Sequence, residues 1–444
     1  MPRTIAITHL GCKLNQAEVE SLARQFARAG YTIVEADQPA DIFILNTCTV
    51  TSIADRKSRQ MLRRAHRINP GAQVIATGCY AQRAPGDLQR MPEVAMVVGN
   101  AEKMRLADLL AETKKTPRSY PVPPGERGAI SASSQEAGAR PYTNGRTRAF
   151  VKIQEGCNQV CAYCIVPKTR GLERSMPMER LIAQVKERVS EGYREVVLTG
   201  TQLGSYGFES GPNPADIPWY ETLIRRILDE TAIERLRMSS LQPQEISPGL
   251  IELCAQGRLC PHVHMPLQAG SNGVLKRMRR RYDTATYAKA VEQLRSAVPD
   301  IAITTDIIVG FPGESDTAFE ESLRFAAAMG FAAMHVFPYS KRPGTSAAFL
   351  PGQVADDVKA ARELRMLKVA DEAREAYRQG MVGKRVRVLW EGKATGSGAR
   401  IWRGHSENYV DVRTRNARRL ANQVTEARIT SADDDGLWCE LGEV

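Results

Sequence analysis

Short apolar runs alternate with amphipathic stretches over most of this 444-residue chain, and this alternation constrains its fold more than any other feature. Between residues 3 and 110, the apolar runs have the length of buried strands and the segments between them have helical periodicity. The strands are expected at 5–8, 41–45, 73–76 and 94–98, and the helices at 16–29 and 53–68. Strands that alternate with helices form parallel sheets. The sequence therefore predicts an α/β chain that begins with a doubly wound parallel sheet.

The alternation stops at residues 113–142 and then resumes. The interrupting segment is rich in proline with scattered Gly, Ser and Thr, so it predicts a linker. Further strands are expected at 149–154, 195–199, 235–239, 263–265, 301–309 and 333–338, with helices between them. Six such units in about 190 residues predict a (β/α)6 partial TIM barrel.

The last part of the chain has a different pattern. A long charged helix is expected at 355–379, followed by alternating runs at 386–390, 409–412 and 437–441 with Gly-containing turns between them. This pattern predicts a small antiparallel β-barrel. We therefore divide the chain into residues 1–112, a linker at 113–142, a core at 143–375 and a C-terminal domain at 376–444.

Composition excludes some classes of protein. No apolar run approaches the roughly 18 residues that a membrane helix requires. The first residues are Met1-Pro2-Arg3 and continue into a strand, which is not the pattern of a signal peptide. The nine cysteines are then expected to be thiols that serve metal binding or catalysis in the cytoplasm, without disulfide bonds.

The chain is basic, with a formal net charge of +11. Lys and Arg cluster at 384–419, 276–281 and 56–67. Such blocks favour a polyanionic partner, nucleic acid first, although basic runs are also common on the solvated faces of ordinary enzymes. Tyr409 and Trp402 have side chains that can stack on bases, but a place in the barrel core is the default expectation for both.

Cys157, Cys161 and Cys164 have the spacing C-x3-C-x2-C within one short loop. Iron–sulfur clusters are normally held by four cysteines, so three thiolates hold three irons of a [4Fe-4S] cluster and leave one iron open. The alternatives are a zinc site or three structural cysteines. Zinc requires a fourth ligand, and no histidine is near in the sequence.

Cys12, Cys48 and Cys79 form another set, although they are far apart in the sequence. Each follows a predicted strand, and the carboxyl ends of parallel strands share the edge of the sheet where ligands bind. Gly11 and Gly78 allow sharp turns beside this edge. The sequence therefore predicts that the three thiols converge on one site, the alternative being three unrelated buried cysteines.

Several segments resemble the radical S-adenosylmethionine (SAM) methylthiotransferase family. They are 11–16, 46–50, 77–82, 156–173, 198–202, 265–271 and 306–314, and the C-terminal segment is similar to a TRAM domain, an RNA-binding module. The resemblance covers essentially the whole chain. Relatives often have arginine where this chain has Met176, so no role for that arginine is carried over.

The resemblance implies two [4Fe-4S] clusters and SAM as cofactors. The cluster at Cys157, Cys161 and Cys164 would pass an electron to SAM and generate a 5′-deoxyadenosyl radical, and the cluster at Cys12, Cys48 and Cys79 would hold a sulfide that SAM methylates. Contacts with SAM are expected from Tyr163, Thr199, Gly200, Ser239, Gln268, Val309 and Gly310. No side chain is implied as a catalytic residue.

The resemblance also implies a substrate. Residues 11–15 look most like the branch that methylthiolates N6-threonylcarbamoyladenosine at C2, 3′ to the anticodon (position 37) of tRNA. Isopentenyladenosine in tRNA and an aspartate of a ribosomal protein are the alternatives within the family. The expected partners are the tRNA anticodon stem-loop and an electron donor such as flavodoxin or ferredoxin. A non-catalytic, zinc-containing RNA-binding protein remains the alternative from a different class.

Overall fold

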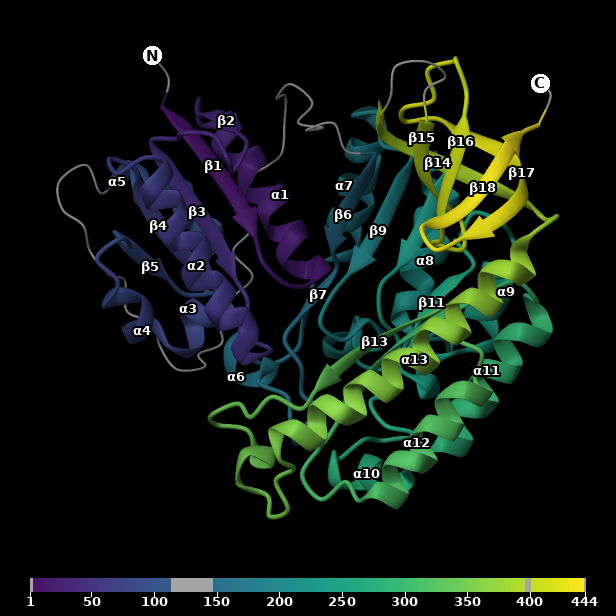
Figure 1. Ribbon diagram of the computed structural model, residues 1–444. Coiled ribbons are helices and arrows are strands. Elements are labelled where there is room, and N and C mark those ends of the chain that lie inside the picture. Colours follow the sequence, from purple (N-terminus) through teal and green to yellow (C-terminus); the bar gives the residue numbers. More distant parts are fainter. Residues whose placement is uncertain (1–2, 113–146, 396–400, 443–444) are drawn as a thin grey trace.

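The computed structural model describes residues 3–112, 147–395 and 401–442 (Figure 1). The predicted linker, residues 113–142, lies outside the described residues. No helix among the described residues is long and apolar enough to cross a membrane.

The N-terminal sheet is parallel throughout, with the strand order β2-β1-β3-β4-β5. Its elements are β1 (Thr4–His9), α1 (Lys13–Arg28), β2 (Thr32–Val34), β3 (Ile42–Thr47), α2 (Ser52–Ile68), β4 (Gln73–Gly78), α3 (Cys79–Arg83), α4 (Pro85–Gln89), β5 (Met96–Val98) and α5 (Leu106–Glu112). The prediction of a parallel sheet is confirmed. The edge strand β2 was not predicted, and β5 begins two residues later than expected.

Local chemistry explains the central elements of this sheet. Every residue of β3 is buried, which is typical of a strand covered on both faces and accounts for its continuous apolar run. The helix α2 begins at Ser52 because the Thr51 side chain accepts a hydrogen bond from the backbone N–H of Ala54 at 3.1 Å.

The central part contains six parallel strands in two sheets, β6-β9-β10 and β11-β12-β13. The strands are β6 (Arg148–Lys152), β9 (Glu195–Thr199), β10 (Arg235–Met238), β11 (His262–His264), β12 (Ala302–Val309) and β13 (Ala333–Pro338). Isolated parallel bridges, Leu236 with Leu259 and Ser240 with His264, connect the two sheets. All six predicted strands are therefore present in chain order.

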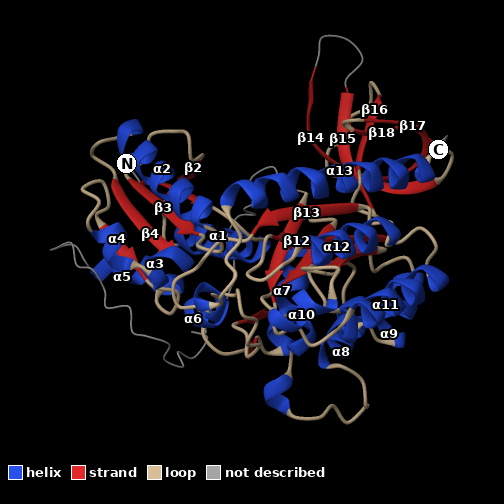
Figure 2. Ribbon diagram, turned by 60° about the horizontal axis from the view of Figure 1, so that its bottom comes forward, coloured by secondary structure: helices blue, strands red, loops and turns tan. Residues whose placement is uncertain are grey.

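Helices accompany these strands. They are α6 (Val166–Arg170), α7 (Met178–Ser190), α8 (Trp219–Glu230), α9 (Pro248–Ala255), α10 (Asn272–Arg277), α11 (Thr284–Ala297), α12 (Asp316–Ala328) and α13 (Asp356–Met381). The strand predicted at 149–154 is divided, because β7 (Gln154–Glu155) leaves the sheet and pairs with β8 (Arg174–Ser175). Figure 2 shows α13 lying along β13 and reaching the C-terminal barrel.

The C-terminal part is a small closed barrel with the strand order β14-β15-β16-β18-β17. Its strands are β14 (Arg385–Thr395), β15 (Ile401–Ser406), β16 (Asp411–Arg415), β17 (Val424–Asp433) and β18 (Gly436–Leu441). The predicted small antiparallel barrel is present, with one exception to its antiparallel pairing, because β16 and β18 are parallel. A ring with an odd number of strands cannot alternate direction at every step, so five strands require one parallel pair.

The two aromatic residues considered for base stacking have different positions. Trp402 is buried in the barrel core, as expected by default. Tyr409 is not part of that core. Its backbone is in the left-handed region (φ 67°), and its ring lies 5.0 Å from that of His262 on β11 and 5.1 Å from that of His405. Tyr409 therefore packs between the barrel and the central strands.

A buried ion cluster joins the central strands to the barrel. Glu195 of β9 accepts from Arg237 at 2.8 Å and pairs with Arg235 at 2.8 Å, and none of the three side chains is appreciably exposed. Both arginines also donate to the backbone carbonyl of Ser406. Burial opposes ionisation of Glu195, but Arg237 and Arg235 outweigh it and hold the pKa of that carboxyl at about 2.

Replacement of Glu195 by glutamine is expected to destabilise the protein by about 3–5 kcal/mol, because it leaves two buried guanidinium groups without their counterion. Urea unfolding at neutral pH measures this loss. The contribution of Glu195 is present above its ordinary pKa of 4.5 and disappears as the pH falls toward 2, so the difference between the two proteins shrinks with acid. Glu179→Gln, which breaks an exposed pair with Arg226, is the control and changes little. Equal stability of Glu195→Gln and the parent at neutral pH contradicts this account.

Candidate functional site

The cysteines of the first set lie at one edge of the N-terminal sheet. Cys48 and Cys79 directly follow β3 and β4, and Cys12 follows β1 after a short turn. The turn passes through Gly11 at φ +98°, where a Cβ atom would lie only 2.7 Å from the sulfur of Cys48. This position therefore requires glycine both for its conformation and for the proximity of the thiol.

The electrostatics of these thiols reflect their mutual proximity. Burial, with smaller contributions from the neighbouring Cys79 and Cys12 thiols, raises the pKa of Cys48 to about 12. Such a thiol is protonated at neutral pH and becomes a thiolate when a metal takes the place of its proton. Cys12 is exposed, whereas Cys48 and Cys79 are buried, so the site opens to solvent on one side.

The second set lies in the loop between β7 and α6. Burial raises the pKa of Cys157 to about 11 and that of Cys164 to about 12, and the Cys161 thiol contributes to both shifts. A side chain at Gly156 would collide with the carbonyl of Leu172, so the loop closes tightly on the segment that follows α6. These three thiols are also held as one group.

The cysteine sulfurs of the two sets fit the [4Fe-4S] clusters that the sequence resemblance implies. Each set offers three sulfur ligands, which are the ligands that iron–sulfur clusters require. Among the described residues, no three His, Cys, Asp or Glu side chains are placed to hold a single metal ion. A cubane of four irons is wider than one ion, so its thiolates need not converge on a single point.

The two cysteine loops are brought together by neighbouring helices. The helix α3, which begins at Cys79, packs against α6, which follows Cys164 closely in the sequence. The side chain of Asn100 donates to the carbonyl of Thr169 in α6 at 2.6 Å. In Figure 1, α1 lies between the N-terminal sheet and strands β6 and β9.

A buried polar network connects the two loops directly. Arg170 donates to Glu18 at 2.9 Å, to Glu155 at 2.8 Å and to the side-chain oxygen of Asn15 at 2.6 Å. Asn15 follows Cys12 in α1, and Glu155 precedes Cys157. The network therefore fixes one cysteine loop relative to the other.

Glu18 is the centre of this network. Its carboxylate also accepts from Lys103 at 2.5 Å and pairs with Lys152 at 3.3 Å. Burial opposes ionisation, but Arg170, Lys103 and Lys152 outweigh it, so the pKa of Glu18 is well below its usual range. Glu18 is thus a carboxylate surrounded by three cations.

The residues expected to contact SAM lie around the carboxyl ends of the central strands. Thr199 is the last residue of β9 and Val309 the last of β12, and each is followed by a glycine, Gly200 and Gly310. Ser239 follows β10, and Gln268 forms an isolated β-bridge with Ile307 of β12. Tyr163 lies in the cysteine loop. Gln268 has a left-handed backbone (φ 68°), which is uncommon outside glycine and is frequent at functional sites. The N–H of Gly310 is already bonded to Glu314 at 2.6 Å, which leaves it no donor for a ligand.

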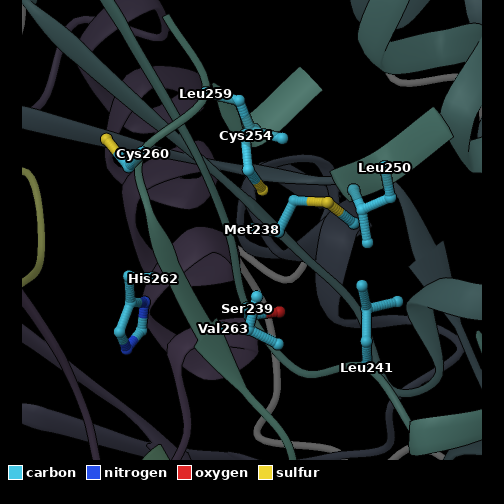
Figure 3. A pocket seen from close by; sticks show the side chains of 9 residues that line it. All are labelled: Met238, Ser239, Leu241, Leu250, Cys254, Leu259, Cys260, His262 and Val263. Atoms are coloured by element: carbon cyan, nitrogen blue, oxygen red, sulfur yellow. The ribbon is translucent and has the colours of Figure 1, made fainter. Parts of the chain in front are cut away.

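Ser239 lines a small cavity between β10, β11 and α9 (Figure 3). The cavity has a volume of about 10 Å³, enough for one water molecule and far too small for SAM. The hydroxyl of Ser239 is buried and has no hydrogen-bond partner among the described residues. Cys254 and Cys260 line the same cavity but point in different directions, so they form no site with each other.

A larger groove opens beside the first set of cysteines. It has a volume of about 700 Å³ and reaches Gly11 and Cys48 from the loop after β3, the end of β13 and the start of α13. Its lining includes three half-exposed apolar side chains, Val50, Ile53 and Phe337. It also includes Lys57, Lys341, Lys359, Asp356 and Glu363.

Buried ion pairs hold the two sides of this groove together. Asp55 of α2 accepts from Arg342 at 3.0 Å and from Arg83 at 2.9 Å. The backbone N–H of Ser52 donates to the hydroxyl of Ser340 at 3.1 Å. The loop after β13 is therefore tied to the N-terminal domain beside the groove.

Neither the pairing of Glu18 with Arg170 nor the position of Arg280 beside Cys161 was predicted from the sequence. The Arg280 guanidinium donates to the sulfur of Cys161 at 3.2 Å, although it belongs to a basic block for which a nucleic-acid partner was expected and a solvated face was the alternative. A local pattern gives no signal for either contact, because the partner is more than a hundred residues away in the chain.

Comparisons with known proteins agree with this geometry. Residues 4–99 match the family described as uncharacterized protein family UPF0004, and residues 151–326 match the radical SAM superfamily. Threonylcarbamoyladenosine tRNA methylthiotransferase MtaB of Bacillus subtilis (strain 168) is 36% identical over 439 residues, which cover 97% of this chain and 94% of the relative. A tRNA-2-methylthio-N(6)-dimethylallyladenosine synthase of Sphingopyxis alaskensis is 33% identical over 442 residues, which cover 99% and 98%.

Among solved structures, the radical SAM methyltransferase TsrM from Kitasatospora setae, with cobalamin and a [4Fe-4S] cluster bound, is similar with a TM-score of 0.54. The match covers 78% of this chain and 77% of that chain at 14% sequence identity. At this identity the likeness concerns the fold, which is the radical SAM fold.

Replacement of Arg170 by glutamine is expected to loosen the junction between the cysteine loops, because it leaves Glu18 and Glu155 buried without their shared cation. Hydrogen–deuterium exchange of the purified protein then increases in α1 and at residues 154–157. Arg174→Gln is the matched control, since Arg174 lies 3.7 Å from Glu155 and is more exposed. Unchanged exchange in Arg170→Gln shows that the network does not hold the junction.

Proposed function

Because this chain belongs to the radical SAM tRNA methylthiotransferase family, we propose that it inserts a methylthio group at C2 of N6-threonylcarbamoyladenosine, 3′ to the anticodon (position 37) of tRNA. The observation that carries the proposal is the pair of cysteine sets, whose loops are joined by the buried network around Glu18. Replacing an aromatic C–H bond by a C–S bond exceeds ordinary acid–base chemistry and requires both a radical source and a sulfur source.

In this proposal each cysteine set holds one [4Fe-4S] cluster. Cys157, Cys161 and Cys164 hold the cluster that binds SAM, and Cys12, Cys48 and Cys79 hold the cluster beside the groove. When bound, the clusters and SAM supply the one-electron chemistry and the sulfur and methyl groups. The protein orients them: the buried Glu18 network fixes the distance between the loops, and Tyr163, Thr199, Gly200, Ser239, Gln268, Val309 and Gly310 shape the SAM site.

We extend the proposal to the roles of the individual domains. The six central strands and their helices act as a (β/α)6 partial TIM barrel over residues 143–375, and the closed barrel at 376–444 acts as a TRAM domain. Residues 1–112 then form the methylthiotransferase domain, with 113–142 as the linker. The protein works in the cytoplasm with an electron donor such as flavodoxin or ferredoxin.

The groove beside Cys48 is suited to the target nucleoside. Its volume of about 700 Å³ lies within the range of small-molecule sites. Phe337 offers an aromatic face for a base, and nucleobases stack readily on such faces. Gly11 and Cys48 line this groove, so the cysteine set that would hold the sulfur-supplying cluster lies beside the space for the base.

The charges of the groove favour the threonylcarbamoyl substituent over an isopentenyl group. Lys57 and Lys341 are exposed and have no ion-pair partner among the described residues, whereas Lys359 pairs with Asp356 at 2.6 Å. A threonylcarbamoyl group carries a carboxylate that a lysine can bind, and an isopentenyl group carries none. Isopentenyladenosine is the second candidate, because the groove is also lined by the apolar Val50 and Ile53. One relative is named as a tRNA-2-methylthio-N(6)-dimethylallyladenosine synthase.

Deletion of this gene is expected to abolish the methylthio derivative of N6-threonylcarbamoyladenosine in cellular tRNA, with accumulation of the unthiolated nucleoside. Mass spectrometry of digested tRNA measures both species, and re-expression of the intact chain is the control. If that derivative persists while methylthio-isopentenyladenosine or the methylthio mark on a ribosomal aspartate disappears, the substrate is the alternative one.

The Cys12→Ala variant separates the roles of the two cysteine sets. Anaerobically reconstituted parent protein is expected to be brown with about eight irons, and the variant to retain about four, because one of two cubanes is lost. The variant still cleaves SAM but transfers no methylthio group to RNA. If the variant loses SAM cleavage while the cluster at Cys157, Cys161 and Cys164 is intact, this division of roles is wrong. A colourless, zinc-containing parent protein supports the RNA-binding alternative.

A further inference from the structure

We propose that Arg280 is a positioning residue that provides the counter-charge for the cluster held by Cys157, Cys161 and Cys164, and that its hydrogen bond to the Cys161 sulfur raises the reduction potential of that cluster. The inference rests on the cluster assigned to this loop under the proposed function. It concerns the electron-transfer step and not the choice of RNA substrate.

The geometry around Arg280 is specific. One terminal nitrogen, Nη1, donates to the Cys161 sulfur at 3.2 Å and lies 3.4 Å from the hydroxyl of Tyr163. The other, Nη2, donates to the side-chain oxygen of Gln242 at 3.2 Å. The guanidinium also lies over the ring of Tyr282, 4.7 Å from its centre. Four contacts from three parts of the chain fix the orientation of this side chain.

Arg280 is a half-buried cation without a carboxylate partner among the described residues. Its protein acceptors, apart from the Cys161 sulfur, are an uncharged hydroxyl and an uncharged amide, and no ion pair to it occurs among the described residues. Its Nε is buried and has no acceptor in the described part of the chain. A buried charge without compensation is costly, so an anion is expected beside it.

The neighbouring carboxylate does not provide this anion. Glu245 lies near enough for Arg280 to favour its ionised form, but it accepts from Gln202 and from the backbone N–H of Gln242, and no ion pair joins it to Arg280 among the described residues. Burial raises the pKa of Glu245 to about 7, so at neutral pH it is only partly ionised. Cysteine thiolates bound to a cluster are then the anions within reach of the guanidinium.

The backbone directs Arg280 inward and its neighbours outward. The carbonyl of Met278 accepts from the N–H of Ala162 at 2.9 Å, which fastens this segment to the cysteine loop. Arg279 then adopts a left-handed conformation (φ 59°), which turns the chain. Arg279 and Arg281 are exposed, so Arg280 alone among these three consecutive arginines contacts a cysteine.

This placement has a consequence for electron transfer. Reduction adds negative charge to a cluster, and a cation that donates to a ligating sulfur stabilises the reduced form. The guanidinium is partly removed from water, and charges are screened less there than in bulk solvent. Hydrogen bonds to cluster sulfurs are among the factors that set cluster potentials.

The test uses full-length protein in which Cys12, Cys48 and Cys79 are all replaced by alanine, so that one cluster remains. In this background we compare Arg280→Gln, Arg280→Lys and the matched control Arg281→Gln by redox titration followed by electron paramagnetic resonance. Arg280→Gln is expected to shift the midpoint potential to a more negative value, Arg280→Lys to shift it less, and Arg281→Gln to leave it unchanged.

An unchanged potential in Arg280→Gln with full iron content overturns the proposal, as does an equal shift in Arg281→Gln. If Arg280→Gln assembles no cluster, Arg280→Lys decides: a more negative potential supports the proposal, and the parental value overturns it. The potential is measured without RNA, so failure to thiolate tRNA leaves this test intact. A parent protein that binds no iron at Cys157, Cys161 and Cys164 refutes the proposed function itself.

Discussion

The relative position of the two cysteine sets depends on the ion pairs that the buried carboxylate of Glu18 makes. Removing a carboxylate from water is costly, and here Arg170, Lys103 and Lys152 together outweigh that cost. Their positions come from α6, from the segment before α5 and from β6. Because these segments must meet for the charge to be compensated, α1 and the N-terminal sheet are held in one orientation against the central strands. The loop that carries Cys12 is consequently fixed relative to the loop of the second set.

The elements that depend on local sequence could be predicted. The strand β3 is buried on both faces, and its apolar run identifies it without knowledge of its neighbours. The edge strand β2 has only three residues, none fully buried, so no apolar run marks it. The barrel strands β15 and β17 mix polar and apolar residues, and the parallel pairing of β16 with β18 follows from closure of the ring, which no single segment encodes.

The same distinction applies to the candidate site. Cys157, Cys161 and Cys164 are recognisable by spacing, and Cys12, Cys48 and Cys79 by their position after strands. Arg170 and Arg280 could not be assigned in this way, because their partners are defined by the folded chain. Arg280 is one of three consecutive arginines in the sequence, and only the left-handed turn at Arg279 determines which of them reaches Cys161.

The central proposal is that each of the two cysteine sets holds one iron–sulfur cluster. Anomalous diffraction at the iron absorption edge, from crystals of the anaerobically reconstituted protein, tests it most directly. The account predicts two strong iron peaks, one among Cys12, Cys48 and Cys79 and the other among Cys157, Cys161 and Cys164. A single iron peak, or peaks that appear only at the zinc edge, would contradict it.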